Sequence, residues 1–97
     1  MVRHIVMINY KDKVNQQQRD DFAKLIQETV SQLPGTKNVA VGKALEMEGK
    51  PRYEAALLVD FDNEPALKSY IENPAHKAAE AQMAPFLSEI LISDYLY

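Results

Sequence analysis

Hydrophobic residues in this chain recur at two different spacings, and the order of those spacings limits the folds open to it. Residues 2–10 form a continuous β-branched and apolar run, which predicts a strand. From about residue 15 to 33, apolar residues such as Phe22, Ile26 and Val30 recur at helical spacing. The chain therefore begins with a strand that is followed by an amphipathic helix.

The rest of the chain predicts two more strands, a divided helix and a last strand. Residues 39–45 and 53–61 alternate apolar side chains with smaller or polar ones, as strands do. A helix is expected over 63–87, where Asn73-Pro74 ends one segment and starts the next, because Asn caps helices and Pro fits a first turn. Residues 89–96 form the last predicted strand. The resulting order is βαββαβ.

This order is typical of the ferredoxin-like fold, an α+β arrangement in which a four-stranded antiparallel sheet carries helices on one face. Residues 1–97 are expected to form a single such domain. The face without helices is too apolar to be left in water, since Ile5 and Met7 lie on one side of the first strand and Val6 and Ile8 on the other. We therefore expect two chains to pack these faces together as a homodimeric α/β barrel.

Composition and charge argue against several classes of function. A net charge of −3 without a long basic run argues against nucleic-acid binding. No segment is long and apolar enough to cross a membrane and no cysteine is present, so we expect a cytoplasmic protein without membrane contact. The three glycines form no nucleotide-binding loop, and no clustered carboxylates accompany the two histidines. Neither a cofactor nor a metal ion is therefore expected.

The stretch Tyr70-Ile71-Glu72-Asn73-Pro74-Ala75-His76 places a phenol and an imidazole on either side of the helix break. If Asn73 caps the second segment, His76 lies in its first turn, where the helix dipole favours the neutral ring. In a catalytic interpretation, His76 takes a proton next to a carbonyl group and Tyr70 donates to the developing enolate oxygen. In a structural interpretation, His76 bonds to backbone near Pro74 and Tyr70 packs in the core. The residues alone leave both open.

The other histidine, His4, lies on the same face of the first strand as Val6 and Ile8. A lone histidine in an apolar strand is more often a core residue with a satisfied hydrogen bond than a catalyst. His4 is therefore interpreted either as such a core residue or as part of the wall of a pocket.

Several stretches of the chain carry a family pattern. They are Arg3-His4-Ile5-Val6, Val41-Gly42, the strand from Tyr53 to Phe61, Leu67 to Tyr70, Asn73-Pro74-Ala75-His76, and Asp94-Tyr95. On these stretches, which span nearly the whole chain, the sequence resembles the stress-responsive dimeric α/β-barrel family. The resemblance implies a homodimer in which each subunit has a pocket between its helices and its sheet.

One plant branch of that family is similar in layout and acts as a polyketide cyclase. Such an enzyme closes a ring in a linear poly-β-keto thioester by aldol condensation, without a cofactor. The resemblance places its catalytic pair at Tyr70 and His76 and its N-terminal pocket histidine at His4. Of its aromatic pocket wall, only Phe22 is aromatic here. The other positions of that wall read Ala23, Ile26 and Leu87.

Three functions remain open for the chain. The first is binding of a small apolar or carbonyl-bearing ligand near Tyr70 and His76. The second is cofactor-free enzymatic chemistry by that pair, such as cyclisation, isomerisation or oxygenation. The third is a structural, stress-stable dimer with a filled core and no ligand. The residues expected to line a pocket are His4, Val6, Ile8, Phe22, Ile26, Leu57, Leu87 and Ile92.

Overall fold

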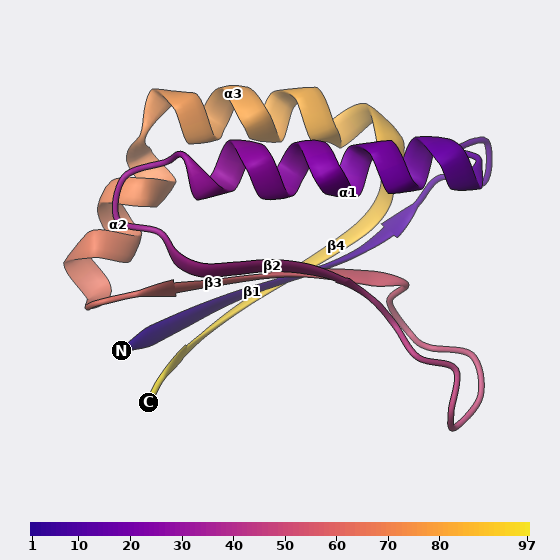
Figure 1. Cartoon of the computed structure of the whole chain (residues 1–97), viewed down its shortest axis with the longest axis horizontal. Coiled ribbons are helices and arrows are strands. Elements are labelled where there is room, and N and C mark those ends of the chain that lie inside the picture. Colours follow the sequence, from indigo (N-terminus) through magenta and orange to yellow (C-terminus); the bar gives the residue numbers. More distant parts are fainter.

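The computed structural model covers residues 1–97 and contains one antiparallel sheet with three α-helices on one of its faces (Figure 1). The sheet has four strands in the order β2-β3-β1-β4. In chain order the elements are β1 (Val2–Tyr10), α1 (Gln16–Ser31), β2 (Lys37–Lys43), β3 (Ala55–Phe61), α2 (Glu64–Glu72), α3 (Pro74–Met83), a 3₁₀ turn (Ala84–Phe86) and β4 (Leu87–Leu96). This arrangement confirms the predicted ferredoxin-like α+β fold.

The core lies between the central strands and the helices. β1 pairs with β3 on one side and with β4 on the other, and its even-numbered residues are buried beneath the helices. The buried hydrophobic residues are Val2, Val6, Ile8, Tyr10, Val14, Ile26, Val30, Leu57, Val59, Phe61, Leu67 and Tyr70. Because side chains alternate along a strand, the odd-numbered residues of β1 face away from the helices.

Asparagine side chains begin all three helices, as expected for N-caps. Asn15 and Gln18 form a reciprocal capping box at α1, with both hydrogen bonds 2.8 Å long. The side-chain oxygen of Asn63 accepts from Ala66 N at the start of α2. Asn73 ends α2 and caps α3, since its side chain accepts from Ala75 N at 2.8 Å. None of these helices has the combination of length and apolarity that a membrane span requires.

Several element boundaries differ from the predicted ones; β3, for example, begins at Ala55 instead of residue 53. β2 ends at Lys43, and Leu45 lies beyond the last pair of the ladder, in the connection to β3, with 76% of its surface exposed. α3 ends at Met83 instead of reaching residue 87, because Pro85 has no N–H to donate to the preceding turn. The last strand consequently begins at Leu87.

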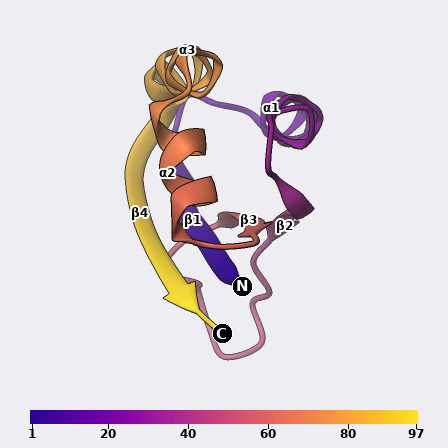
Figure 2. The same ribbon diagram turned by 90° about the vertical axis from the view of Figure 1, so that its left-hand side faces the viewer.

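β4 forms an open edge of the sheet (Figure 2). It presents apolar side chains on both of its faces: Leu91 and Tyr95 point away from the helices, and Ile90 and Ile92 lie on the helix side. All four are exposed, Ile92 by 52%. An apolar edge of this kind is unusual for a soluble protein that has no partner.

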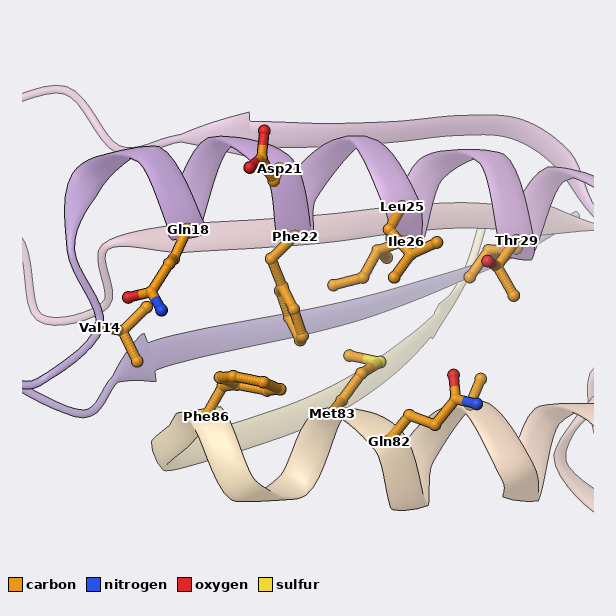
Figure 3. A pocket seen from close by; sticks show the side chains of 12 residues that line it. Val14, Gln18, Asp21, Phe22, Leu25, Ile26, Thr29, Gln82, Met83 and Phe86 are labelled. Carbon is orange, nitrogen blue, oxygen red and sulfur yellow. The ribbon is translucent and has the colours of Figure 1, made fainter.

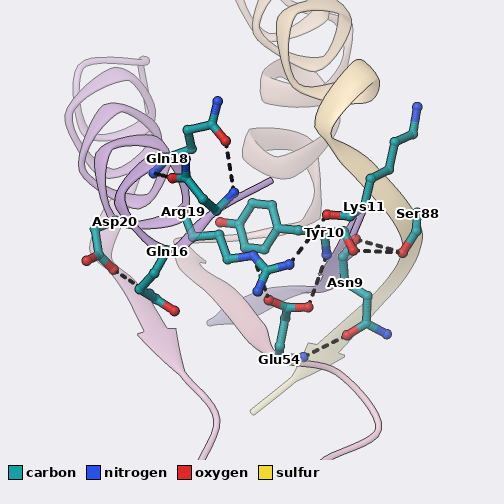
Figure 4. A network of polar contacts seen from close by, with 10 residues as sticks. Asn9, Tyr10, Lys11, Gln16, Gln18, Arg19, Asp20, Glu54 and Ser88 are labelled. Atoms are coloured by element: carbon teal, nitrogen blue, oxygen red, sulfur yellow. Dashed lines mark hydrogen bonds and ion pairs between the residues drawn. The ribbon is translucent and has the colours of Figure 1, made fainter. Parts of the chain in front are cut away.

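A polar network joins the end of β1 to the start of α1 and β3 (Figure 4). Glu54 Oε2 accepts from Tyr10 N at 3.3 Å, and Glu54 N donates to Asn9 Oδ1 at 2.9 Å. Arg19 Nε lies 3.4 Å from Glu54 Oε1, and its guanidinium stands 5.4 Å from the centre of the Tyr10 ring. Phe22, one turn further along α1, packs edge-on against the same ring with 5.6 Å between ring centres. The network therefore fixes the first half of α1 above the sheet.

Candidate functional site

The helix break brings Tyr70 and His76 together. Tyr70 lies in the last turn of α2 and His76 in the first turn of α3. Their ring centres are 4.4 Å apart, with 48° between the ring planes. Pro74 prevents one continuous helix, and the change of direction at Asn73 brings the two rings into contact at a tilt.

Tyr70 is packed among aromatic rings. It is 3% exposed, and the rings of Phe61 and His4 lie 5.0 and 5.8 Å from its own. Burial, reinforced by the Glu80 carboxylate, raises the pKa of Tyr70 to about 12. At neutral pH the phenol is therefore a hydrogen-bond donor and not a base.

His76 is held at one ring nitrogen. Its Nδ1 lies 2.9 Å from Glu80 Oε1 and 3.3 Å from the carbonyl oxygen of Ile71. The side chain is 13% exposed. The backbone contact near the break belongs to the structural interpretation, and the short distance to the Tyr70 ring agrees with the catalytic one, so His76 combines features of both.

His4 forms a second pair of a histidine with a carboxylate. Its Nδ1 is hydrogen-bonded to Asp94 Oδ1, and the two residues are direct cross-strand neighbours in the pairing of β1 with β4. His4 is buried, and its ring stands edge-on to Tyr70. It is therefore a satisfied core histidine that also forms one wall around Tyr70.

An apolar cleft of about 390 Å³ lies between α1 and α3 (Figure 3). Phe22 and Phe86 meet in it with ring centres 5.4 Å apart. Its lining residues are Val14, Gln18, Asp21, Phe22, Leu25, Ile26, Thr29, Val30, Ala79, Gln82, Met83 and Phe86. Eight of these twelve are hydrophobic, and the volume is in the range of small-molecule sites.

The residues expected to line one pocket are distributed over several places. Phe22 and Ile26 line the cleft. Leu87 packs against the buried cluster, and Ile92 is half-exposed on β4. The remaining four expected residues lie buried in the sheet beneath the helices: His4, Val6, Ile8 and Leu57. What these residues do toward a ligand stays a prediction.

Tyr70 and His76 do not line this cleft, but α3 connects them to it. His76, Ala79 and Met83 follow one another at helical spacing on one face of α3, and the last two line the cleft. A second, open groove of about 870 Å³ lies between α2 and the end of β4, lined by residues that include Leu67, Ile71 and Asp94. Neither catalytic candidate lines that groove either.

Sequence reasoning missed four functional candidates. Met83 and Phe86 continue the helical spacing that begins at His76, and Glu80 stands four residues after His76. This spacing could have placed all three on the same side of the helix as His76. Asp94 as the partner of His4 depends on strand register, which the sequence does not reveal. No group of three or more His, Asp or Glu side chains is placed to hold a metal ion.

A family model and a known protein both match this chain over nearly its whole length. A family model described as Stress responsive A/B Barrel Domain matches residues 2–96. Olivetolic acid cyclase from Cannabis sativa is 28% identical over 95 residues, which cover 97% of this chain and 94% of the cyclase.

Two solved structures illustrate the fold. A dimeric ferredoxin-like protein of unknown function from Thermobifida fusca superimposes with a TM-score of 0.83 at 27% identity, covering 99% of this chain and 90% of that one. A hydroxynitrile lyase from Passiflora edulis superimposes with a TM-score of 0.87 at 21% identity, covering 99% of this chain and 92% of that one. The second likeness concerns the fold alone.

Proposed function

The chain belongs to the stress responsive A/B barrel domain family, and from that premise we propose that it binds a small apolar, carbonyl-bearing molecule. The observation that carries the proposal is the apolar cleft between α1 and α3, whose wall includes Ala79 and Met83 at helical spacing from His76. The apolar part of the ligand occupies the cleft among Phe22, Met83 and Phe86. Its carbonyl end lies toward the break between α2 and α3.

The groups at the break suit a carbonyl oxygen. The Tyr70 hydroxyl stays protonated at neutral pH, so it has a proton to offer. A ligand that reaches it gains a hydrogen bond in surroundings poor in water, where such bonds are stronger than in solvent. Ala79, one turn after His76 on α3, lines the cleft and has a small side chain.

A thermal-shift series with medium-chain methyl ketones and aldehydes tests the proposal. Ketone at about 100 times its Kd adds about 2.7 kcal/mol to the free energy of unfolding, which raises Tm measurably. Ala79→Phe fills the cleft and removes the shift, whereas the matched Ala78→Phe, on the exposed side of α3, retains it. A series in which no compound raises Tm contradicts the proposal and favours the structural dimer without a ligand.

A second candidate is cofactor-free proton transfer, which the 4.4 Å approach of Tyr70 and His76 favours. In this function His76 Nε2 removes a proton from the carbon next to the carbonyl, and the Tyr70 hydroxyl stabilises the enolate oxygen. The 28% identical cyclase closes rings, and cyclisation and isomerisation both begin with such a step.

Exchange of the ligand's α-protons for deuterium in D₂O, followed by NMR, detects this step without knowledge of the natural substrate. His76→Ala should abolish the exchange while leaving Tm close to wild type. Loss of folding in this variant would instead identify a core histidine.

We also propose that the protein is a homodimer joined through the open faces of its sheets. The exposed apolar side chains of β4 and the dimeric state of the Thermobifida fusca relative support this. Sedimentation equilibrium should give twice the chain mass at micromolar concentration. Leu91→Lys, on the open face, should shift the protein toward monomer, whereas Leu45→Lys, in the connection between β2 and β3, should not.

A further inference from the structure

We propose that Glu80 is a positioning residue for His76, one that fixes the proton on Nδ1 and leaves Nε2 as the free, basic nitrogen. The inference deepens the proposed function, since it concerns the same pair of rings. It assigns a role to a side chain that stands on the outer part of α3, one turn after the histidine.

The first step is the chemistry of the two groups that face Nδ1. Glu80 Oε1 at 2.9 Å belongs to a carboxylate, and the Ile71 oxygen at 3.3 Å belongs to a carbonyl. Both accept hydrogen bonds and neither has a proton to donate. Nδ1 must therefore carry the hydrogen in the neutral ring, which leaves the lone pair on Nε2.

The second step is the reason why the Ile71 carbonyl is free to take part. In a continuous helix this oxygen would accept from the N–H of Ala75, four residues later. Here Ala75 N donates instead to the Asn73 side chain at 2.8 Å. The break between the helices thus leaves an unpaired carbonyl beside His76, and the ring of His76 spans the end of α2 and the second turn of α3.

The third step is the electrostatic effect of Glu80 on the cluster. Its negative charge helps to raise the pKa of Tyr70, so its field extends to the phenol as well as to the imidazole. When Nε2 takes a proton, the imidazolium ring forms an ion pair with the same carboxylate. Glu80 thus stabilises the cation that a proton transfer creates and helps to keep Tyr70 in its donor form.

His4 offers an internal comparison. Its Nδ1 is hydrogen-bonded to the carboxylate of Asp94, whereas the Nδ1 of His76 lies within ion-pair distance of the Glu80 carboxylate. The two histidines on opposite sides of Tyr70 therefore share one tautomer, but they depend on different carboxylates. A substitution at Glu80 should change His76 and leave His4 as it was.

Long-range ¹H–¹⁵N correlation spectra of the ligand-free protein test the assignment, because protonated and unprotonated ring nitrogens have well-separated ¹⁵N shifts. In the wild type, above the pH at which the rings become neutral, both histidines should show a protonated Nδ1. Glu80→Ala should move part of the His76 population to the Nε2-protonated form, because only the 3.3 Å contact with the Ile71 carbonyl remains at Nδ1. Glu80→Gln should retain the wild-type form because its amide oxygen still accepts. Glu72→Ala, which removes an equal charge from the end of α2, should change neither ring.

Two results would overturn the proposal: a wild-type His76 protonated at Nε2, or a Glu80→Ala variant whose His76 keeps its Nδ1 hydrogen. These spectra need no ligand, so the tautomer of His76 can be determined even if the ligand-binding proposal fails. In the deuterium-exchange reaction, Glu80→Ala should lower kcat with KM unchanged, and Glu80→Gln should restore part of the loss.

Discussion

The rings of Tyr70 and His76 lie 4.4 Å apart although the two residues belong to different helices. Their approach depends on Asn73, which ends one helix and caps the next, and on Pro74, which prevents the two from merging. The geometry of the candidate site therefore depends on Asn73 and Pro74, which lie between the two ring-bearing residues in the sequence.

Asn73→Ala should separate these rings. The substitution removes the hydrogen bond to Ala75 N and should lower the free energy of unfolding by about 1 kcal/mol. Asn63→Ala removes the corresponding cap of α2 and should cost a similar amount. Urea denaturation measures the two losses. NMR shifts of the Tyr70 and His76 rings should change strongly only in Asn73→Ala, and equal shifts in both variants would show that the cap does not set the approach.

Tyr70 should be among the last tyrosines to ionise. Its pKa is raised to about 12, so ultraviolet titration of the five tyrosines should retain a step near that pH that Tyr70→Phe removes. Because the folded-state pKa lies above the ordinary value of about 10, the folded state binds this proton more tightly than the unfolded state. The contribution to stability is present below pH ~10 and is lost as pH rises through about 12. An unchanged titration curve in Tyr70→Phe would contradict the assignment.

Asp60 should control the response to acid. The hydrogen bonds from Arg3, and after them one from Asn38, hold the pKa of this carboxyl well below its usual range. A lowered pKa stabilises the folded state above pH ~4, and that contribution is lost as pH falls further. Asp60→Asn should therefore be less stable at neutral pH and should lose less stability on acidification.

Denaturant titrations at a series of pH values measure this difference. Asp62→Asn is the matched control, because it breaks the exposed pair with Lys37, and such pairs contribute about 0–1 kcal/mol. If the free energy of unfolding of Asp60→Asn still falls steeply at acid pH, other carboxylates cause the acid sensitivity.

The fold could be predicted from the sequence because the local spacing of apolar residues reflects which side chains each helix or strand buries. The continuous apolar run of residues 2–10, the caps Asn15 and Asn73 and the break at Pro74 each specify their own element, and the structure agrees with all of them. The predicted end of β2 at Leu45 was wrong, because in the sequence an apolar residue just past a strand looks the same as one inside it. Strand pairing, and not hydrophobicity, ends that element.

The site was only partly predictable. The sequence identified Tyr70 and His76, and helical spacing could have added Glu80 and Met83. The sequence did not reveal that the Tyr70 and His76 rings lie outside the apolar cleft. Their position relative to the cleft depends on how far apart α1 and α3 lie on the sheet. Long-range geometry of this kind has no local signal.

The cleft should prefer uncharged ligands over carboxylates of the same chain length. Asp21 is the only charged side chain among its lining residues, and in Figure 3 it points away from α3. A partly exposed charge repels an anion by about 0.2–1 kcal/mol, which corresponds to a few-fold in Kd. A methyl ketone should therefore bind a few-fold more tightly than the fatty acid of equal length, and the gap should narrow at high salt.

Asp21→Asn should reduce that preference, and Asp21→Lys should reverse it. Asp20→Asn is the control, because Asp20 is adjacent in sequence and carries the same charge but does not line the cleft. Isothermal titration of wild type and variants with the matched pair of ligands gives the ratio of the two Kd values. A preference for the ketone that survives Asp21→Lys would show that the cleft excludes carboxylates through desolvation by its apolar wall and not through charge.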